Sequence, residues 1–168
     1  MYRIRFLYVI LKSVLSAKRG LLDDFVLHFW AIPLIDTDFS RLFTQTYALY
    51  MGLARWNLLF NSEFRTAALK KGWAPVTTAE TMTYKKSVKA FDKVRLVTRI
   101  IHWNDRRFYI EHLFYVNNEV YAQTYVEGLI RSPKGPLKSG EAFAELGVTR
   151  QSPELPEKLK GWVESLAK

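Results

Sequence analysis

The chain has 168 residues, about one domain's worth, and its 49% hydrophobic and 15% aromatic content argues against disorder. It contains no cysteine, which excludes disulfides, thiolate metal ligands and cysteine nucleophiles. The formal net charge of +9 allows a polyanionic small molecule or anionic lipid as partner, but no nucleic-acid-binding motif accompanies it, so we expect no nucleic-acid partner.

Residues 1–20 form a basic segment in which residues 3–18 have the pattern of an amphipathic helix. The apolar side chains recur at helical spacing: Ile4, Leu7, Tyr8, Leu11, Val14 and Leu15. This helix either lies on lipid headgroups as an interfacial anchor or packs on the domain or a partner subunit. No apolar run approaches the ~20 residues that cross a bilayer. We therefore expect a cytoplasmic protein, with peripheral membrane contact through residues 3–18 as a further expectation.

Residues 23–35 are expected to form a strand, in which Phe25 and Leu27 alternate with Val26 and His28. Pro33 should lie at the end of this strand or on a sheet edge, because proline cannot donate to a ladder. The polar turn at residues 36–40 then offers side chains that can cap a helix.

Residues 44–60 are almost uniformly apolar, interrupted only by Gly52, Arg55 and Asn57. Seventeen residues are too many for a typical strand, and the segment lacks period-2 alternation, so the pattern predicts a helix. A helix that is apolar all round belongs inside a domain. A second helix is predicted over residues 63–71, ending at Gly72.

From residue 73 the pattern changes to strands, over residues 76–88, 94–103, 108–116 and 120–130. Val94, Leu96, Thr98, Ile100 and His102 are predicted to share one face of their strand. Short turns at residues 104–105 and 117–118 imply antiparallel neighbours. Residues 136–168 form a tail with helices at 139–147 and 156–167.

This order predicts an α+β protein in which residues 21–135 form one domain, a long central helix wrapped by a curved antiparallel sheet. Four stretches of this domain resemble the hotdog thioesterase-like superfamily, in the branch of the 4-hydroxybenzoyl-CoA thioesterases and thioesterase superfamily member 6. They are the D-x-D of residues 36–38, the Ala-Arg-Trp of 54–56, the Lys-Gly-Trp-Ala-Pro-Val of 71–76 and the strand–turn–strand of 101–112. The resemblance implies the hotdog fold and a homodimer or a dimer of dimers.

The resemblance also implies a reaction, hydrolysis of an acyl-CoA or acyl-carrier-protein thioester. The carbonyl oxygen would be polarised by backbone N–H groups at the start of the central helix. Asp38 matches the catalytic aspartate of the family, and its simpler role is helix capping. The His-x-Asn-Asn run that follows D-x-D in relatives is absent here. Thr44 and Gln45 occupy roughly the positions of those asparagines and are further catalytic candidates.

Candidate substrate-binding residues are Asp36, Tyr47, Lys85, Lys86 and Arg131, and Asp36 has a structural role as its alternative. The cations among them could meet the phosphates of CoA, or could be ordinary charged strand ends. Glu80 is a reserve candidate for the base. The histidines, at positions 28, 102 and 112, match no metal motif, so we expect neither a metal nor a cofactor.

Two functions follow, and they belong to different classes. The first is a cofactor-free thioester hydrolase that uses Asp38 and the helix N-terminal amides. The second is a non-catalytic hotdog module that binds an acyl chain or lipid at a membrane surface. The retained D-x-D favours the hydrolase, whereas the missing His-x-Asn-Asn run favours the binding module.

Overall fold

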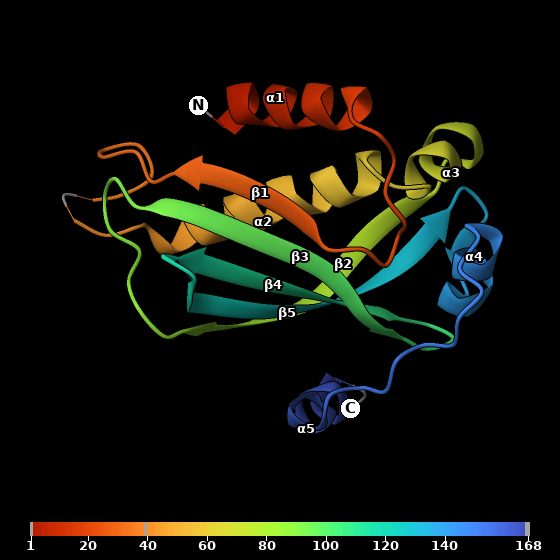
Figure 1. Cartoon of the computed structure of the whole chain (residues 1–168). Coiled ribbons are helices and arrows are strands. Elements are labelled where there is room, and N and C mark those ends of the chain that lie inside the picture. Colours follow the sequence, from red (N-terminus) through yellow and green to blue (C-terminus); the bar gives the residue numbers. More distant parts are fainter. Residues whose placement is uncertain (1, 39, 167–168) are drawn as a thin grey trace.

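The computed structural model describes residues 2–38 and 40–166 and shows a long helix held by a curved sheet (Figure 1). Of the described helices, none has the length and apolar content needed to span a membrane. The elements in chain order are α1 (Tyr2–Leu15), β1 (Phe25–Trp30), α2 (Thr44–Phe60), α3 (Phe64–Lys71), β2 (Ala74–Tyr84), β3 (Lys93–Trp103), β4 (Phe108–Val116), β5 (Glu119–Ser132), β6 (Gly135–Leu137), α4 (Ser139–Glu145) and α5 (Glu157–Leu166).

The sheet is antiparallel throughout and follows the order β1-β3-β4-β5-β2, with β6 paired to β5. Strands β1 and β2 therefore form its two edges. α2 lies along the concave face, with the bounds that its apolar run predicts. The predicted α+β hotdog architecture is thus confirmed.

Two hydrophobic clusters fill the space between α2 and the sheet. The first surrounds the N-terminal half of α2 and includes Tyr47, Met51 and Phe114. The second surrounds the C-terminal half and includes Leu58, Phe108 and Ile130. The alternation of apolar residues along the strands places both clusters on the helix-facing side of the sheet.

Helix α1 packs on α2, but not with the apolar stripe that its sequence pattern singles out. Its inner face is formed by Arg5, Phe6, Val9 and Ser13, and the Ser13 hydroxyl donates to Asn57 Oδ1 on α2 at 2.9 Å. The apolar stripe points away from the domain and is exposed. Polar contacts, together with Phe6 and Val9, therefore hold α1 in place.

The predicted face of His102 is wrong. The register of β3 against β4 shifts between Ile100 and His102, which leaves Ile101 as the extra residue of a bulge. A one-residue slip exchanges the two faces of a strand. As a result Trp103 joins the buried second cluster, and His102 pairs with Tyr109.

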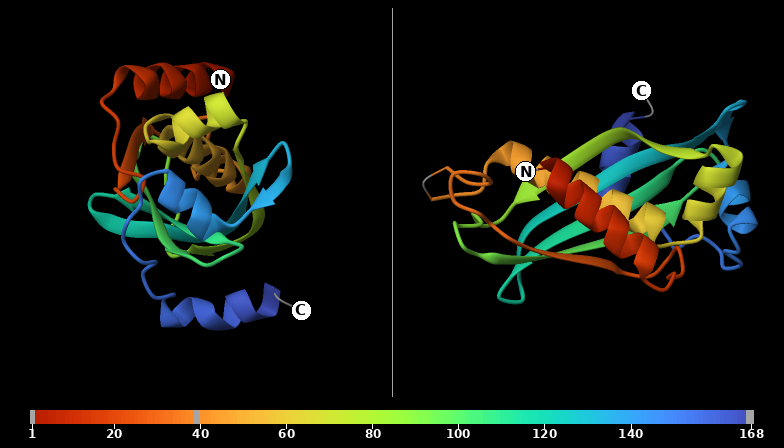
Figure 2. Two further views of the ribbon diagram at one scale, coloured as in Figure 1. Left: turned by 90° about the vertical axis from the view of Figure 1, so that its right-hand side faces the viewer. Right: turned by 90° about the horizontal axis from the view of Figure 1, so that it is seen from above.

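The convex side of the sheet is partly covered by the C-terminal tail. Figure 2 shows α1 and α5 on opposite sides of the sheet. In α5, Leu159 is buried and the Lys158 ammonium lies 5.0 Å from the centre of the Tyr125 ring on β5. The chain itself thus supplies cover for part of the outer sheet face.

Candidate functional site

Asp38 lies on the loop that leads into α2, and its side chain is exposed. Its Oδ1 accepts the backbone N–H groups of Ser40 and Arg41, each at 2.7 Å. These hydrogen bonds, first that of Arg41 and then that of Ser40, lower the pKa of the carboxyl. Asp38 is therefore a fixed, ionised carboxylate just ahead of the helix.

The N-terminus of α2 keeps its first-turn N–H groups free of side-chain capping. The residue that precedes the helix, Phe43, has an extended backbone, and among the described residues no side chain caps the helix there. Thr44 and Gln45 follow with exposed side chains. Because such N–H groups carry the positive end of the helix dipole, this end of α2 favours developing negative charge.

Asp36, the first acid of the D-x-D, is buried. Its carboxylate accepts two hydrogen bonds from the Arg5 guanidinium, at 2.8 and 2.7 Å, and one from the Ile32 N–H at 2.9 Å. Its carbonyl oxygen accepts the Thr46 hydroxyl at 3.1 Å. Arg5 also contacts the Tyr50 hydroxyl. This network ties α1, the loop before α2 and the first turns of α2 together.

Tyr47 is buried beneath the start of α2. Its hydroxyl accepts the Val88 N–H at 3.4 Å, and its ring packs edge-on against Tyr84 and Phe114. Burial is the main cause of the raised pKa of this hydroxyl. Tyr47 is therefore a neutral side chain that packs the first turn of α2 against the sheet.

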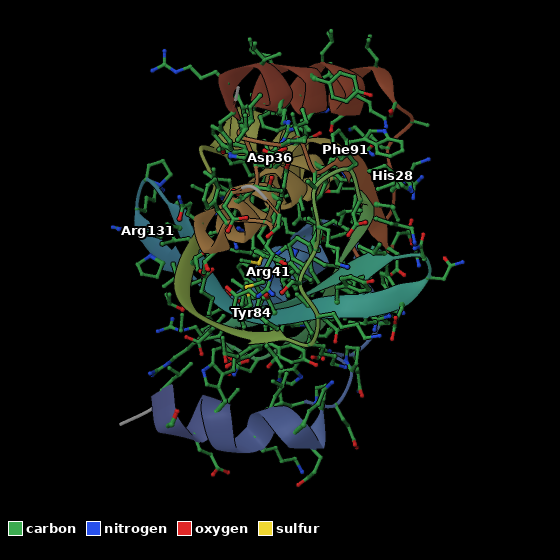
Figure 3. All side chains as sticks on the ribbon, turned by 90° about the vertical axis from the view of Figure 1, so that its left-hand side faces the viewer. His28, Asp36, Arg41, Tyr84, Phe91 and Arg131 are labelled. Carbon is green, nitrogen blue, oxygen red and sulfur yellow. The ribbon has the colours of Figure 1, made fainter. Side chains whose placement is uncertain are left out.

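The three cations proposed for CoA do not gather in one protomer. Lys85 and Lys86 are exposed where β2 ends, and Lys86 pairs with Glu119. Arg131 pairs with Ala74, at the opposite end of β2 from Lys85 and Lys86. At ~3.3 Å per residue, the two ends of β2 are about 33 Å apart. Figure 3 looks onto the end of the molecule where Asp36, Arg41 and Tyr84 lie.

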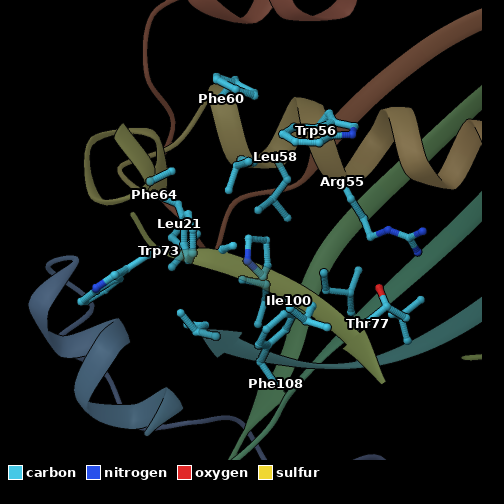
Figure 4. Close-up of a pocket in the computed structure, with 18 of the residues that line it drawn as sticks. Leu21, Arg55, Trp56, Leu58, Phe60, Phe64, Trp73, Thr77, Ile100 and Phe108 are labelled. Carbon is cyan, nitrogen blue, oxygen red and sulfur yellow. The ribbon is translucent and has the colours of Figure 1, made fainter. Parts of the chain in front are cut away.

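An apolar cavity of about 400 Å³ lies under the C-terminal half of α2, within the ~300–1,000 Å³ typical of ligand pockets (Figure 4). Its wall combines α2, α3, the start of β2 and the sheet. Among its lining residues are Trp56, Phe64, Trp73, Thr77 and Phe108. Its walls come from segments far apart in the chain.

A buried polar row separates the two hydrophobic clusters. Thr98, His112 and Thr124 lie opposite one another on β3, β4 and β5, and Thr98 Oγ1 is 2.8 Å from His112 Nδ1. Above this side of the sheet, Arg55 of α2 forms an ion pair with Glu80 of β2 at 3.7 Å. The alternation along each strand could have placed these three residues on the helix-facing side. It could not have shown that they lie opposite one another on neighbouring strands.

The burial of His112 should make the stability of the protein depend on pH. Burial, and then the charge of Arg55, lower its pKa well below the usual 6.5. Below about pH 6.5 the unfolded chain therefore binds a proton that the folded chain does not, so the free energy of unfolding falls by up to about 1.4 kcal/mol per pH unit.

Urea unfolding between pH 5.5 and 7.5 should show this slope in the wild-type protein and a smaller one in His112→Gln, which has no group that titrates there. His28 remains in both proteins, and its pKa is also lowered by burial, so the difference isolates His112. Equal slopes would contradict a neutral, buried His112.

Over residues 2–38 and 40–166 no cluster of three His, Cys, Asp or Glu side chains could hold a metal ion.

Comparison with known proteins identifies the family of this chain. Protein THEM6 of Xenopus laevis is 24% identical over 172 aligned residues, which cover 96% of this chain and 78% of that protein. The solved structure of BH1999 gentisyl-coenzyme A thioesterase superposes with a TM-score of 0.58 at 24% identity, covering 71% of this chain and 98% of that one. SAV2348 from Staphylococcus aureus, in complex with CoA, superposes with a TM-score of 0.66 at 10% identity, covering 86% and 96%.

At such identities the two solved structures show only the fold of this chain. The family to which it belongs is shown by the family model. The model described as "Thioesterase-like superfamily" matches residues 33–163, most of the chain. The chain therefore belongs to the thioesterase-like superfamily, which supports thioester hydrolysis as its class of reaction.

Proposed function

We propose that this chain hydrolyses acyl-CoA thioesters at the N-terminal end of α2. The observation that carries the proposal is the exposed, ionised carboxylate of Asp38 in the loop that leads into α2, whose N-terminus no described side chain caps. The first-turn N–H groups would hold the carbonyl oxygen as it becomes an oxyanion. Asp38 would take a proton from water as that water adds to the carbonyl carbon, after which the C–S bond breaks and the thiol leaves with a proton.

Two observations favour CoA over a carrier protein. The names of two structural neighbours, the gentisyl-coenzyme A thioesterase and the CoA complex of SAV2348, associate those proteins with CoA. Basic side chains also surround this end of the molecule: Arg41 and Lys89 are bridge partners in neighbouring loops, and Lys85 follows β2. Such cations suit the phosphates of CoA.

A homodimer would complete the site. β2 is an edge strand that is largely exposed, so it can pair with β2 of a second copy. Antiparallel pairing places the Ala74 end of one copy beside the Tyr84 end of the other. Arg131 and the cavity wall at Thr77 would then approach Asp38 and Lys85 of the second copy. The thioester would be cleaved at one protomer while its acyl group occupies the cavity of the other.

Mixed dimers test this shared site. Asp38→Asn removes the carboxylate, and Ala68→Trp fills the cavity that Ala68 lines. Each variant homodimer should be inactive, whereas a purified mixed dimer should regain about half of the wild-type thiol release, because one of its two sites is then intact. Freshly mixed homodimers that have not exchanged subunits serve as the control. A mixed dimer as inactive as the homodimers would place the whole site in one protomer.

The exposed stripe of α1 favours a second proposal, that the protein works at a membrane surface. Ile4, Leu7, Leu11 and Leu15 are 61–77% exposed and lie on the side of α1 that faces away from the domain. Lys12, Lys18 and Arg19 add positive charge beside them. An apolar stripe with adjacent cations is typical of helices that lie in the interface of anionic membranes.

The triple substitution Leu7→Ser, Leu11→Ser and Leu15→Ser should lower affinity for vesicles of phosphatidylcholine and phosphatidylserine by about 100-fold or more, because each leucine adds roughly 1.5–3 kcal/mol of apolar burial. Vesicle flotation measures the effect. Leu34→Ser is the matched control, because Leu34 is equally exposed but lies outside α1. Flotation of the triple variant at the wild-type level would exclude the stripe as a membrane contact.

A further inference from the structure

Gly128 of β5 lies against the ring of Phe108 on the neighbouring strand β4. The two residues are register partners, so they share one face of the sheet. A Cβ atom at position 128 would lie 2.5 Å from Phe108 Cζ and 3.0 Å from the carbonyl oxygen of Val76 on β2. Real Cβ atoms essentially never come within 3.0 Å of another heavy atom. The ring of Phe108 therefore occupies space over β5 that any other residue at position 128 would need.

The ring of Phe108 is also part of the wall of the apolar cavity. Phe108 and Ile100 line the cavity from the sheet, whereas Leu58 lines it from α2 (Figure 4). Phe143 of α4, whose ring centre is 6.2 Å from that of Phe108, fills neighbouring space. The open volume beside the ring is the cavity itself. A side chain at position 128 would therefore push the ring into the cavity and make the cavity smaller.

The lining and the volume of the cavity suit a hydrocarbon chain. The lining is almost entirely aliphatic and aromatic, and Arg55, which also lines it, is paired with Glu80. An apolar cavity of about 150 Å³ holds one benzene molecule, which is roughly 25 Å³ for each carbon atom. At that ratio, the cavity of about 400 Å³ holds a chain of at most about 16 carbons.

We propose that Gly128 is a positioning residue for substrate selection. By leaving room for the ring of Phe108 over β5, it sets the longest acyl chain that the cavity accepts. The inference rests on the proposed thioester hydrolysis and adds the substrate class, which is straight-chain acyl groups of up to about 16 carbons. In this role Gly128 touches no reacting atom and acts only through the ring of Phe108.

Thiol release from saturated acyl-CoA esters, from butyryl-CoA to stearoyl-CoA, tests this role. Gly128→Ala should lower kcat/KM about 10-fold or more for the longest ester that the wild type accepts, mainly through KM, because a single methylene that no longer fits costs this much. Its rate with butyryl-CoA should change less than about two-fold, whereas a general loss of folding would lower all rates alike. Phe108→Leu, which shortens the wall without altering the backbone, should lengthen the longest accepted chain by about two carbons. Gly128→Ala should have a smaller effect in the Phe108→Leu protein than alone, because the ring that it displaces is gone.

Gly161→Ala is the matched control, because a Cβ atom there meets nothing within 4 Å, and it should keep the wild-type length profile. Binding of fatty acids from hexanoate to stearate, followed through the fluorescence of Trp56 and Trp73 in the cavity wall, should show the same length limits without hydrolysis. This result therefore stands apart from that of the thiol-release assay. Phe108→Leu decides the matter alone if Gly128→Ala does not fold. A wild-type length limit in every folded variant would overturn the proposal, and so would an equal effect of Gly128→Ala with and without the Phe108 ring.

Discussion

Asp38→Asn is expected to lower thiol release from acyl-CoA by about 100-fold or more, the usual loss when a general base is removed. An asparagine Oδ1 can still accept the N–H groups of Ser40 and Arg41, so the loop ahead of α2 should keep its shape while its negative charge is lost. Free thiol can be followed with a thiol-reactive dye, and the assay has no protein background because the chain lacks cysteine.

The matched control is Asp105→Asn, an exposed aspartate on the β3–β4 turn, which should change the rate by less than about two-fold. A panel of acyl-CoA esters of different length should be used for each protein. An active wild type together with an equally active Asp38→Asn would remove Asp38 from the reaction. A wild-type protein that binds acyl-CoA but releases no thiol from any ester would favour the binding-module function instead.

Arg5→Met is expected to lower the free energy of unfolding by about 3–5 kcal/mol, because it leaves the carboxylate of Asp36 buried without its cation. The side chain of Asp36 is only 6% exposed, and Arg5 provides two of its hydrogen bonds. Adding Asp36→Asn should recover at least about 1 kcal/mol, because the amide keeps an acceptor for the Ile32 N–H and carries no charge.

Urea unfolding followed by circular dichroism measures both effects. Lys138→Met serves as the control: the Lys138–Glu141 ion pair is exposed, so its loss should cost less than about 1 kcal/mol. A loss of less than 1 kcal/mol for Arg5→Met would mean that α1 contributes little to the anchoring of the loop that carries Asp38. Because α1 and this loop share the Arg5–Asp36 pair, we also expect the single variant to lose thiol release.

The central helix and the strands could be predicted because each has a strong local signal. The run of residues 44–60 is too long and too apolar for anything but a buried helix, and its bounds are those of α2. The strand at 108–116 likewise agrees with β4. The face of His102 was predicted wrongly because a bulge depends on the partner strand, which a single strand's pattern does not contain.

The candidate site, too, could be predicted only where its signal is local in the sequence. The sequence could identify Asp38 and the helix start because both lie in one short stretch of the chain, and their catalytic role stays a proposal. The row of Thr98, His112 and Thr124 could not be predicted, because it depends on the registers of three strands. The inner face of α1 was also hidden, since Arg5 and Ser13 are polar and bind through specific partners that only tertiary structure brings near.

Helix α5 limits how protomers could assemble. It lies across the convex sheet surface near Tyr125, with Leu159 buried beneath it, so another subunit cannot stack there without displacing it. The β2 edge has no such obstacle. We therefore expect association along the β2 edge of the sheet and not by stacking of sheets.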